Sequence, residues 1–152
     1  MTLTRQLFGP ADRRVAQALR DLSLSVPASS AANEQSAIAQ EALAILDRNG
    51  DSSSVLRADL LGDLGQHYAE YDLPKALDYT EQSVRLLRHY PPSTDLKDGL
   101  ELLGVVNTQM GDYAKAEPVL VEAIQLSRRL QGDPNAHLPA LYAYLAEAQY
   151  FR

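Results

Sequence analysis

The chain contains no cysteine among its 152 residues. Disulfide bonds and thiol chemistry are therefore excluded, and nothing argues for an oxidising compartment. No apolar run approaches the roughly 20 residues that a helix needs to cross a bilayer. The N-terminal residues also lack the apolar core of a signal peptide. We therefore expect a cytoplasmic protein with no membrane as its partner.

Basic residues are in the minority. Lysine and arginine number 14 against 20 aspartates and glutamates, so the formal net charge at pH 7 is −6. Such an acidic balance disfavours nucleic acid or an anionic membrane as the main partner. The basic pairs Arg13-Arg14 and Arg128-Arg129 are isolated, and we interpret them as solvated helix residues rather than nucleic-acid contacts.

Catalytic motifs are absent as well. The chain has no glycine-rich phosphate loop, no Gly-x-Ser-x-Gly elbow and no cysteine or histidine cluster. Asp63, His67 and Glu70 share one helical face, a spacing that suits a metal or an acid–base pair. The alternative is a solvated polar face with ordinary i, i+4 pairing, and we favour it because no second helix offers similar ligands. We expect no enzyme activity, no metal and no cofactor.

What the chain does contain is an internal repeat. Leu22, Leu64, Leu103 and Leu145 are each followed by a small residue, and they fall 42, 39 and 42 residues apart. A period of this length is typical of stacked repeats, in which each unit is too small to bury its own apolar face. Such architectures present extended surfaces to partners and seldom enclose an active site.

The unit that begins near Leu103 shows the local physics best. Its first helix should end at Gly111, since glycine tolerates the left-handed position after a helix, and Asp112 can cap the next helix. Ala116 and Ala123 lie seven residues apart and therefore on one face. Gly104 lacks a side chain where we expect two helices to approach closely.

This unit resembles the tetratricopeptide repeat, whose pattern is a Leu-Gly pair in the first helix and spaced alanines in the second. The spacing and the long second helices are similar to the 42-residue variety of kinesin light chains and many bacterial signalling proteins. The resemblance implies an all-α, right-handed superhelical solenoid of antiparallel helix pairs. It also implies a protein–protein interaction scaffold in a regulatory or signalling context.

The predicted organisation is one solenoid over residues 11–152, preceded by a lead-in of residues 1–10 without regular structure. No segment alternates apolar and polar residues over the length of a strand, so we expect no β structure. The units are 11–50, 51–91, 92–131 and a partial 132–152. Seven helices are expected, at about 11–25, 31–47, 54–71, 73–90, 94–111, 112–130 and 135–152.

The resemblance also places a groove along the first helix of each pair. It implies that the residues two before and immediately after each Leu-Gly pair face this groove: Arg20, Leu24, Gly62, Gln66, Glu101, Val105, Ala143 and Glu147. The family members that clamp a terminal carboxylate use lysine and asparagine there, so we reject that function. Five carboxylates can make the groove acidic, relieved by Arg20: Asp59, Asp63, Asp98, Glu101 and Glu147. We expect a basic or mixed peptide as ligand. The alternative interpretation is that these are surface carboxylates that bind no ligand.

The last helix has more large apolar residues than one packing stripe can use. Leu138, Leu141, Leu145 and Ala148 form a stripe that can pack on the preceding pair. Tyr144, Tyr150 and Phe151 cannot all share that stripe, since a helix turns about 100° per residue. Large apolar surface should therefore face away, and a second interpretation is a self-association module that forms a two-fold homodimer through this helix.

Overall fold

The computed structural model describes residue 9 and residues 12–26, 32–131 and 138–152. These residues form an all-α protein without a strand, as predicted. Most of the expected lead-in, and the expected starts of the second and last helices, lie outside the described residues. Seven helices make up the described part: α2 (Arg13–Ser25), α3 (Ala32–Arg48), α4 (Val55–Tyr68), α5 (Leu73–Leu87), α6 (Thr94–Gln109), α7 (Tyr113–Gln131) and α8 (Leu138–Phe151).

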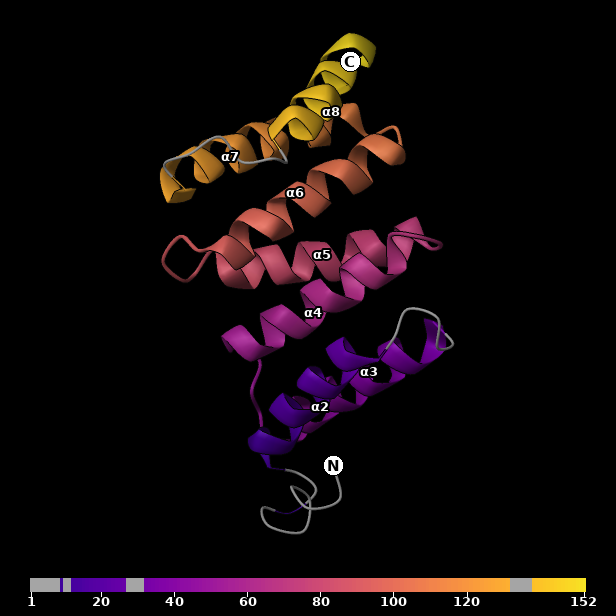
Figure 1. Ribbon diagram of the computed structural model, residues 1–152, viewed down its shortest axis with the longest axis vertical. Helices are drawn as coiled ribbons and strands as arrows, with labels where there is room; N and C mark the ends of the chain where they lie inside the picture. The colour runs from indigo at the N-terminus through magenta and orange to yellow at the C-terminus, as the bar shows by residue number, and fades with distance from the viewer. Residues whose placement is uncertain (1–8, 10–11, 27–31, 132–137) are drawn as a thin grey trace.

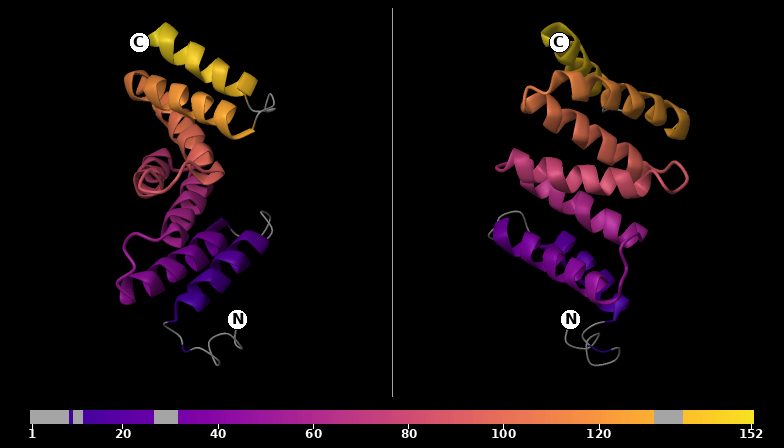
Figure 2. Two further views of the ribbon diagram at one scale, coloured as in Figure 1. Left: turned by 90° about the vertical axis from the view of Figure 1, so that its left-hand side faces the viewer. Right: turned by 180° about the vertical axis from the view of Figure 1, so that it is seen from behind.

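The helices pack mostly as antiparallel pairs of sequence neighbours. The pairs are α2 with α3, α4 with α5 and α6 with α7, and α8 packs on α7. They follow one another along the long axis of the molecule, so that α2 and α8 lie at opposite ends (Figures 1 and 2). Contacts also join α4 to α6 and α6 to α8, so the first helices of successive pairs are neighbours.

Glycine shapes the α6–α7 pair in two ways, and both were predicted. Gly111 follows α6 with φ of +79°, a left-handed conformation that glycine adopts without steric cost. Its N–H bonds to the carbonyl of Thr108 at 2.9 Å, and the N–H of Asp112 bonds to that of Asn107 at 2.8 Å. Within α6, a Cβ added to Gly104 would lie 2.6 Å from Cγ of Leu120 in α7. The two helices therefore approach closely at the position where Gly104 has no side chain.

The α4–α5 turn differs from the prediction, because α4 ends at Tyr68 instead of Tyr71. The N–H of Asp72 bonds to the carbonyl of Tyr68 at 2.8 Å. The Asp72 carboxylate then accepts a 3.2 Å bond from the N–H of Lys75 and so caps α5. Pro74 occupies the first turn of α5, where its missing N–H has no cost. Because α4 ends early, the last three residues that were expected in α4 belong to the turn instead.

Three apolar clusters form the core, and each joins neighbouring pairs. The first lies mainly between α2, α3 and α4, the second between α4, α5, α6 and α7, and the third between α7 and α8. Ala116 and Ala123 are fully buried on α7, as their spacing predicted. Because each cluster draws side chains from neighbouring pairs, the stack is held together along its length.

The Ser93 cap of α6 gives a direct test of local stability. Its hydroxyl oxygen accepts a 3.2 Å bond from the N–H of Leu96. Ser93→Ala should lower the free energy of unfolding by about 1 kcal/mol, because one N–H at the helix start loses its acceptor. Urea denaturation measures this loss. Ser93→Asp should retain most of the stability, and Ser52→Ala, at an exposed position outside the helices, should change it by less than about 0.5 kcal/mol. Equal midpoints for the two alanine variants would refute the cap.

Candidate functional site

A cavity of about 270 Å³ lies where α2, α4 and α6 meet, with α5 behind it. We call it the carboxylate cavity. It brings together six of the residues predicted to face or charge the groove, from three different helices. Its lining consists of Arg20, Asp59, Gly62, Asp63, Gln66, Ser83, Leu87, Asp95, Asp98, Gly99 and Leu102.

Arg20 is the central cation of this cavity and joins α2 to α4. Its Nε donates a 2.8 Å hydrogen bond to Oδ2 of Asp63, and its Nη1 lies 3.2 Å from Oδ2 of Asp59. All three side chains are mostly buried. Burial acts to lower the pKa of Arg20, but the Asp63 hydrogen bond and the attraction of nearby carboxylates outweigh it and raise this pKa above its ordinary value. Arg20 is therefore a permanent charge that compensates the cavity's acids.

The compensation is incomplete, as Asp59 shows. Burial raises the pKa of Asp59 above its ordinary value of 3.8, and repulsion from Asp95 and Asp63 adds to the shift. The attraction of Arg20 opposes both effects without cancelling them. Asp59, Asp63 and Asp95 thus surround a single guanidinium, and the cavity retains an excess of negative charge that a further cation would relieve.

A second cavity, of about 510 Å³, lies between α4, α6 and α8, and we call it the α6–α8 cavity. Lys97 lines it with only 4% of its side chain exposed; its Nζ lies 2.6 Å from Oδ1 of Asp98 and 3.5 Å from Oε1 of Glu101. Burial acts to lower the pKa of Lys97, but the hydrogen bond to Asp98 and the attraction of Glu101 raise it. One ammonium therefore offsets part of the acidity predicted for Asp98 and Glu101.

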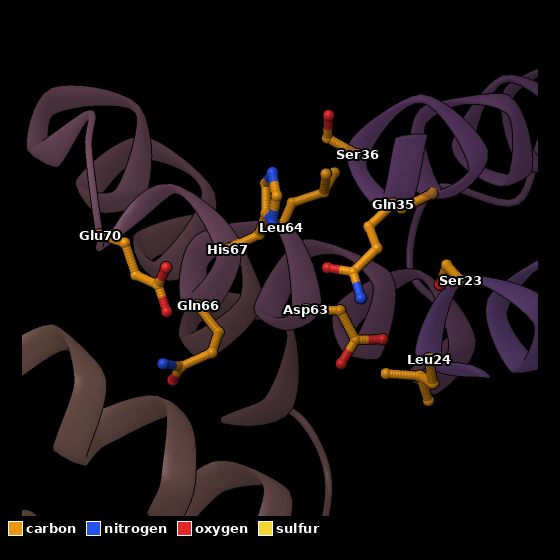
Figure 3. A pocket seen from close by; sticks show the side chains of 10 residues that line it. Ser23, Leu24, Gln35, Ser36, Asp63, Leu64, Gln66, His67 and Glu70 are labelled. Atoms are coloured by element: carbon orange, nitrogen blue, oxygen red, sulfur yellow. The ribbon is translucent and has the colours of Figure 1, made fainter. Parts of the chain in front are cut away.

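A third cavity, of about 250 Å³, lies between α2, α3 and α4, and we call it the α2–α4 cavity (Figure 3). Leu24 and Leu64 give it an apolar wall, while Gln35, Asp63 and Glu70 add polar atoms. Gln66 lines all three cavities. The three cavities therefore follow one another along the first helices of the pairs.

His67 is half-buried and lines the α2–α4 cavity together with Asp63 and Glu70, the two carboxylates predicted on its helical face. Its Nε2 is buried and has no hydrogen-bond partner among the described residues, and its ring packs edge-on against Tyr68 and Tyr71 at 5.5 and 5.3 Å. The Asp63 carboxylate bonds to Arg20. In the part of the chain that the structure describes, no group of three or more histidine or carboxylate side chains is placed to hold a metal ion.

The predicted groove residues thus separate into two groups. Leu24 lines the α2–α4 cavity, while Glu101 and Val105 line the α6–α8 cavity. Ala143 and Glu147 are exposed on α8 and line none of the three cavities described above. The structure brings together the residues of α2, α4 and α6 and leaves those of α8 outside.

Sequence reasoning missed Asp95 and Lys97. Asp95 stands three residues before Asp98 and so shares its helical face, a spacing that would have revealed it. Lys97 falls 39 residues after Ala58, at a repeat position that is buried on α4. A lysine at a repeat position that is otherwise buried could have indicated a buried charge.

The tyrosines of α8 and Phe151 do not all face away from the other helices. Tyr144 is half-buried against the third core cluster and lines the α6–α8 cavity, which corrects its predicted outward orientation. Phe151 stacks on Tyr113 at 5.4 Å although 59% of its surface is exposed. Tyr150 is 82% exposed. Of the three predicted residues, Tyr150 alone is almost free of intramolecular cover.

The fold and the cavities define an all-α protein of stacked helix pairs with a carboxylate-lined face. Compared with known proteins, the chain matches no protein-family model and no curated protein. None of the helices in the described ranges combines the length and apolar character that crossing a membrane requires.

Proposed function

We propose that this protein is a tetratricopeptide-type solenoid that binds a basic or mixed peptide along the first helices of its pairs. The observation that carries the proposal is the carboxylate cavity, in which one arginine stands against several carboxylates from α4 and α6. The proposed mechanism is recognition on a rigid superhelical surface, without a catalytic step or a cofactor. The context is regulation or signalling.

Equivalent packing in successive pairs supports the repeat. Gly65 and Gly104 are 39 residues apart, and both lie where a side chain would collide with the following helix. The residue against Gly65 is Thr80 of α5, and the residue against Gly104 is Leu120 of α7. The two pairs therefore use the same position for their closest approach.

The chemistry of the face favours a cationic side chain with an apolar stem. Asp95 is exposed at the edge of the carboxylate cavity, where an ammonium or guanidinium can reach it. Asp98 is exposed beside it and already pairs with Lys97. Leu87 and Leu102 provide apolar surface beside them for the methylene stem of lysine or arginine. Gln66 offers an amide to all three cavities, which suits the backbone of an extended peptide. Charge complementarity of this kind raises association rates and selects partners.

Fluorescence anisotropy with two labelled sets of 12-residue peptides tests the proposal, one set rich in lysine and arginine and the other in aspartate and glutamate. We expect the basic set alone to contain binders, with affinity falling as salt rises. Asp95→Asn should weaken binding about five-fold, a loss of about 1 kcal/mol. Asp78→Asn, at an exposed position of α5 outside the three cavities, makes the same charge change and should have little effect.

The pH dependence has a definite sign. Protonation of Asp59 removes a negative charge from the carboxylate cavity, so affinity for a basic peptide should fall as pH decreases through its pKa. That pKa lies above the ordinary value of 3.8, and the decline should begin at a correspondingly higher pH. Binding of acidic peptides, or equal effects of Asp95→Asn and Asp78→Asn, would contradict the proposed function.

A further inference from the structure

The α2–α4 cavity adjoins the carboxylate cavity but differs from it in charge. The two cavities share Asp63 and Gln66 in their linings, so a ligand held in one can extend into the other. In the α2–α4 cavity, Asp63 is already bonded to Arg20 at 2.8 Å, and Glu70 is exposed. The rest of the lining contains no aspartate, glutamate, lysine or arginine. A cation therefore gains less here than in the carboxylate cavity, and a neutral group is favoured.

Two helices give this cavity a buried apolar wall. Ala39 of α3 and Leu64 of α4 line it, and they are 3% and 1% exposed. Leu24 of α2, which is largely exposed, adds apolar surface at the edge. The volume of about 250 Å³ exceeds the roughly 150 Å³ that hold a benzene ring in a protein interior. One aromatic ring therefore fits against the apolar wall.

His67 adds a buried polar atom that lacks a partner. Its imidazole lines the cavity, and its Nε2 makes no hydrogen bond among the described residues. His67 follows Leu64 by three residues and so shares its helical face, as Figure 3 shows. A buried polar atom without a partner costs free energy, and a ligand that supplies the partner recovers it. The cavity thus combines an apolar wall with an adjacent hydrogen-bonding group.

We propose that the α2–α4 cavity binds the side chain of a tyrosine in the basic peptide, an inference that rests on the proposed function. The ring packs against Leu64, and the phenolic hydroxyl bonds to Nε2 of His67. Tyrosine is the side chain that joins a large apolar body to a neutral hydroxyl at its tip. Because a hydroxyl both donates and accepts, it can pair with Nε2 in either tautomer of the imidazole. Phenylalanine lacks this group, and the N–H of tryptophan can only donate.

The shared lining also sets where the tyrosine stands in the peptide. Side chains two residues apart in an extended chain point to the same face, about 7 Å from one another. The two cavities are immediate neighbours, because Asp63 and Gln66 line both. We therefore expect the tyrosine two residues before or two residues after the lysine or arginine that enters the carboxylate cavity.

Fluorescence anisotropy with otherwise identical basic 12-residue peptides tests this inference. The peptides carry tyrosine, phenylalanine or alanine two residues before or two residues after a central arginine. In one of the two positions, tyrosine should bind about twenty-fold more tightly than alanine, because the ring buries apolar surface and the hydroxyl finds a partner. It should bind about five-fold more tightly than phenylalanine, which supplies the ring alone.

Variants of the protein assign these two contributions. His67→Phe keeps an aromatic ring but removes Nε2, so tyrosine and phenylalanine peptides should bind it equally. His89→Phe makes the same change at an exposed position outside the three cavities and should keep the five-fold preference. Leu24→Ala should weaken both aromatic peptides, whereas Leu22→Ala, at an exposed position of α2 outside the cavity, should not. Circular dichroism should show the same helical content for all variants.

The outcomes separate this inference from the proposed function. If the alanine peptides bind and the tyrosine peptides bind no more tightly, the inference is wrong while the peptide-binding function stands. A preference for tyrosine over phenylalanine that persists in His67→Phe, or that His89→Phe also abolishes, would overturn the role of His67 and with it the inference. If no basic peptide binds at all, the proposed function fails and the inference fails with it.

Discussion

Gly104→Leu should be among the most destabilising single substitutions in this chain, with an expected loss of about 3 kcal/mol in the free energy of unfolding. A Cβ at this position already lies 2.6 Å from Cγ of Leu120, and three further carbons need space in the same place. Leu120 is fully buried in the third core cluster and cannot move aside without disturbing α7 and α8. Urea or thermal denaturation measures the loss.

Two variants separate overpacking from a general effect of replacing glycine. Gly62→Ala places a Cβ 3.3 Å from Oγ of Ser83 and meets no other neighbour this closely. The higher helix propensity of alanine should roughly offset that contact, so stability should stay within about 1 kcal/mol of the parent. Combining Gly104→Leu with Leu120→Ala should recover part of the loss, because the two side chains compete for one space. Additive losses in that double variant would mean that the register of α6 against α7 is wrong.

Arg20→Met should have the second largest effect, a loss of about 2 kcal/mol at neutral pH. Arg20 compensates Asp59 and Asp63 at 3.2 and 2.8 Å, and its removal leaves mostly buried carboxylates facing one another. Methionine keeps much of the apolar stem, so the loss reports the charge. An exposed pair between α5 and α7 serves as control. Arg88→Met breaks the Arg88–Glu122 ion pair, in which both side chains are more than two-fifths exposed, and should cost less than about 1 kcal/mol.

The loss in the free energy of unfolding on Arg20→Met should be larger at neutral pH than at acidic pH. Burial already raises the pKa of Asp59 in the folded state, and removing Arg20 raises it further. A carboxyl whose folded-state pKa is raised destabilises the fold when it is charged, so the deficit is complete at pH values above that pKa. It should shrink as pH falls through the folded-state pKa toward the ordinary value of 3.8. Denaturation of parent and variant at pH 7 and pH 4 measures the difference.

The same variant connects stability with the proposed function. Arg20 competes with a bound cation for Asp59 and Asp63, so Arg20→Met should bind basic peptides more tightly than the parent chain while folding less stably. Arg88→Met should not change the affinity. A deficit that is independent of pH, together with unchanged peptide affinity, would show that Arg20 contributes packing rather than charge.

Several features of the fold could be predicted because they depend on only a few neighbouring residues. Gly111 was predicted to end the first helix of its pair, and it follows α6 in a left-handed conformation with φ of +79°. Ala116 and Ala123 were predicted on one face of the next helix, and both are fully buried on α7. These patterns arise within one or two helical turns and can be recognised from sequence alone. The groove assignment of Asp59, Asp63 and Gln66 came instead from the resemblance to the tetratricopeptide repeat, and all three line the carboxylate cavity.

The electrostatics of the site could be predicted only in part. The groove was expected to be acidic with Arg20 as its cation, and the carboxylate cavity contains Arg20 together with Asp59, Asp63 and Asp98. Lys97 changes the adjacent α6–α8 cavity, because its ammonium is buried beside Asp98 and Glu101. Whether a long side chain reaches water or folds back depends on how closely α8 covers it, which no local pattern specifies.

The sequence by itself therefore determined the helices, the glycine turn after α6, the small residues at close contacts and the acidic character of one face. These depend on backbone conformation and on side-chain spacing along a single helix. The tertiary structure decided which side chains are covered. Tyr144 and Tyr150 belong to the same helix, yet the first is half-buried against the core and the second is 82% exposed. His67 likewise turns its Nε2 inward against expectation. The physical reason is that burial depends on where neighbouring helices lie, and distant contacts set those positions.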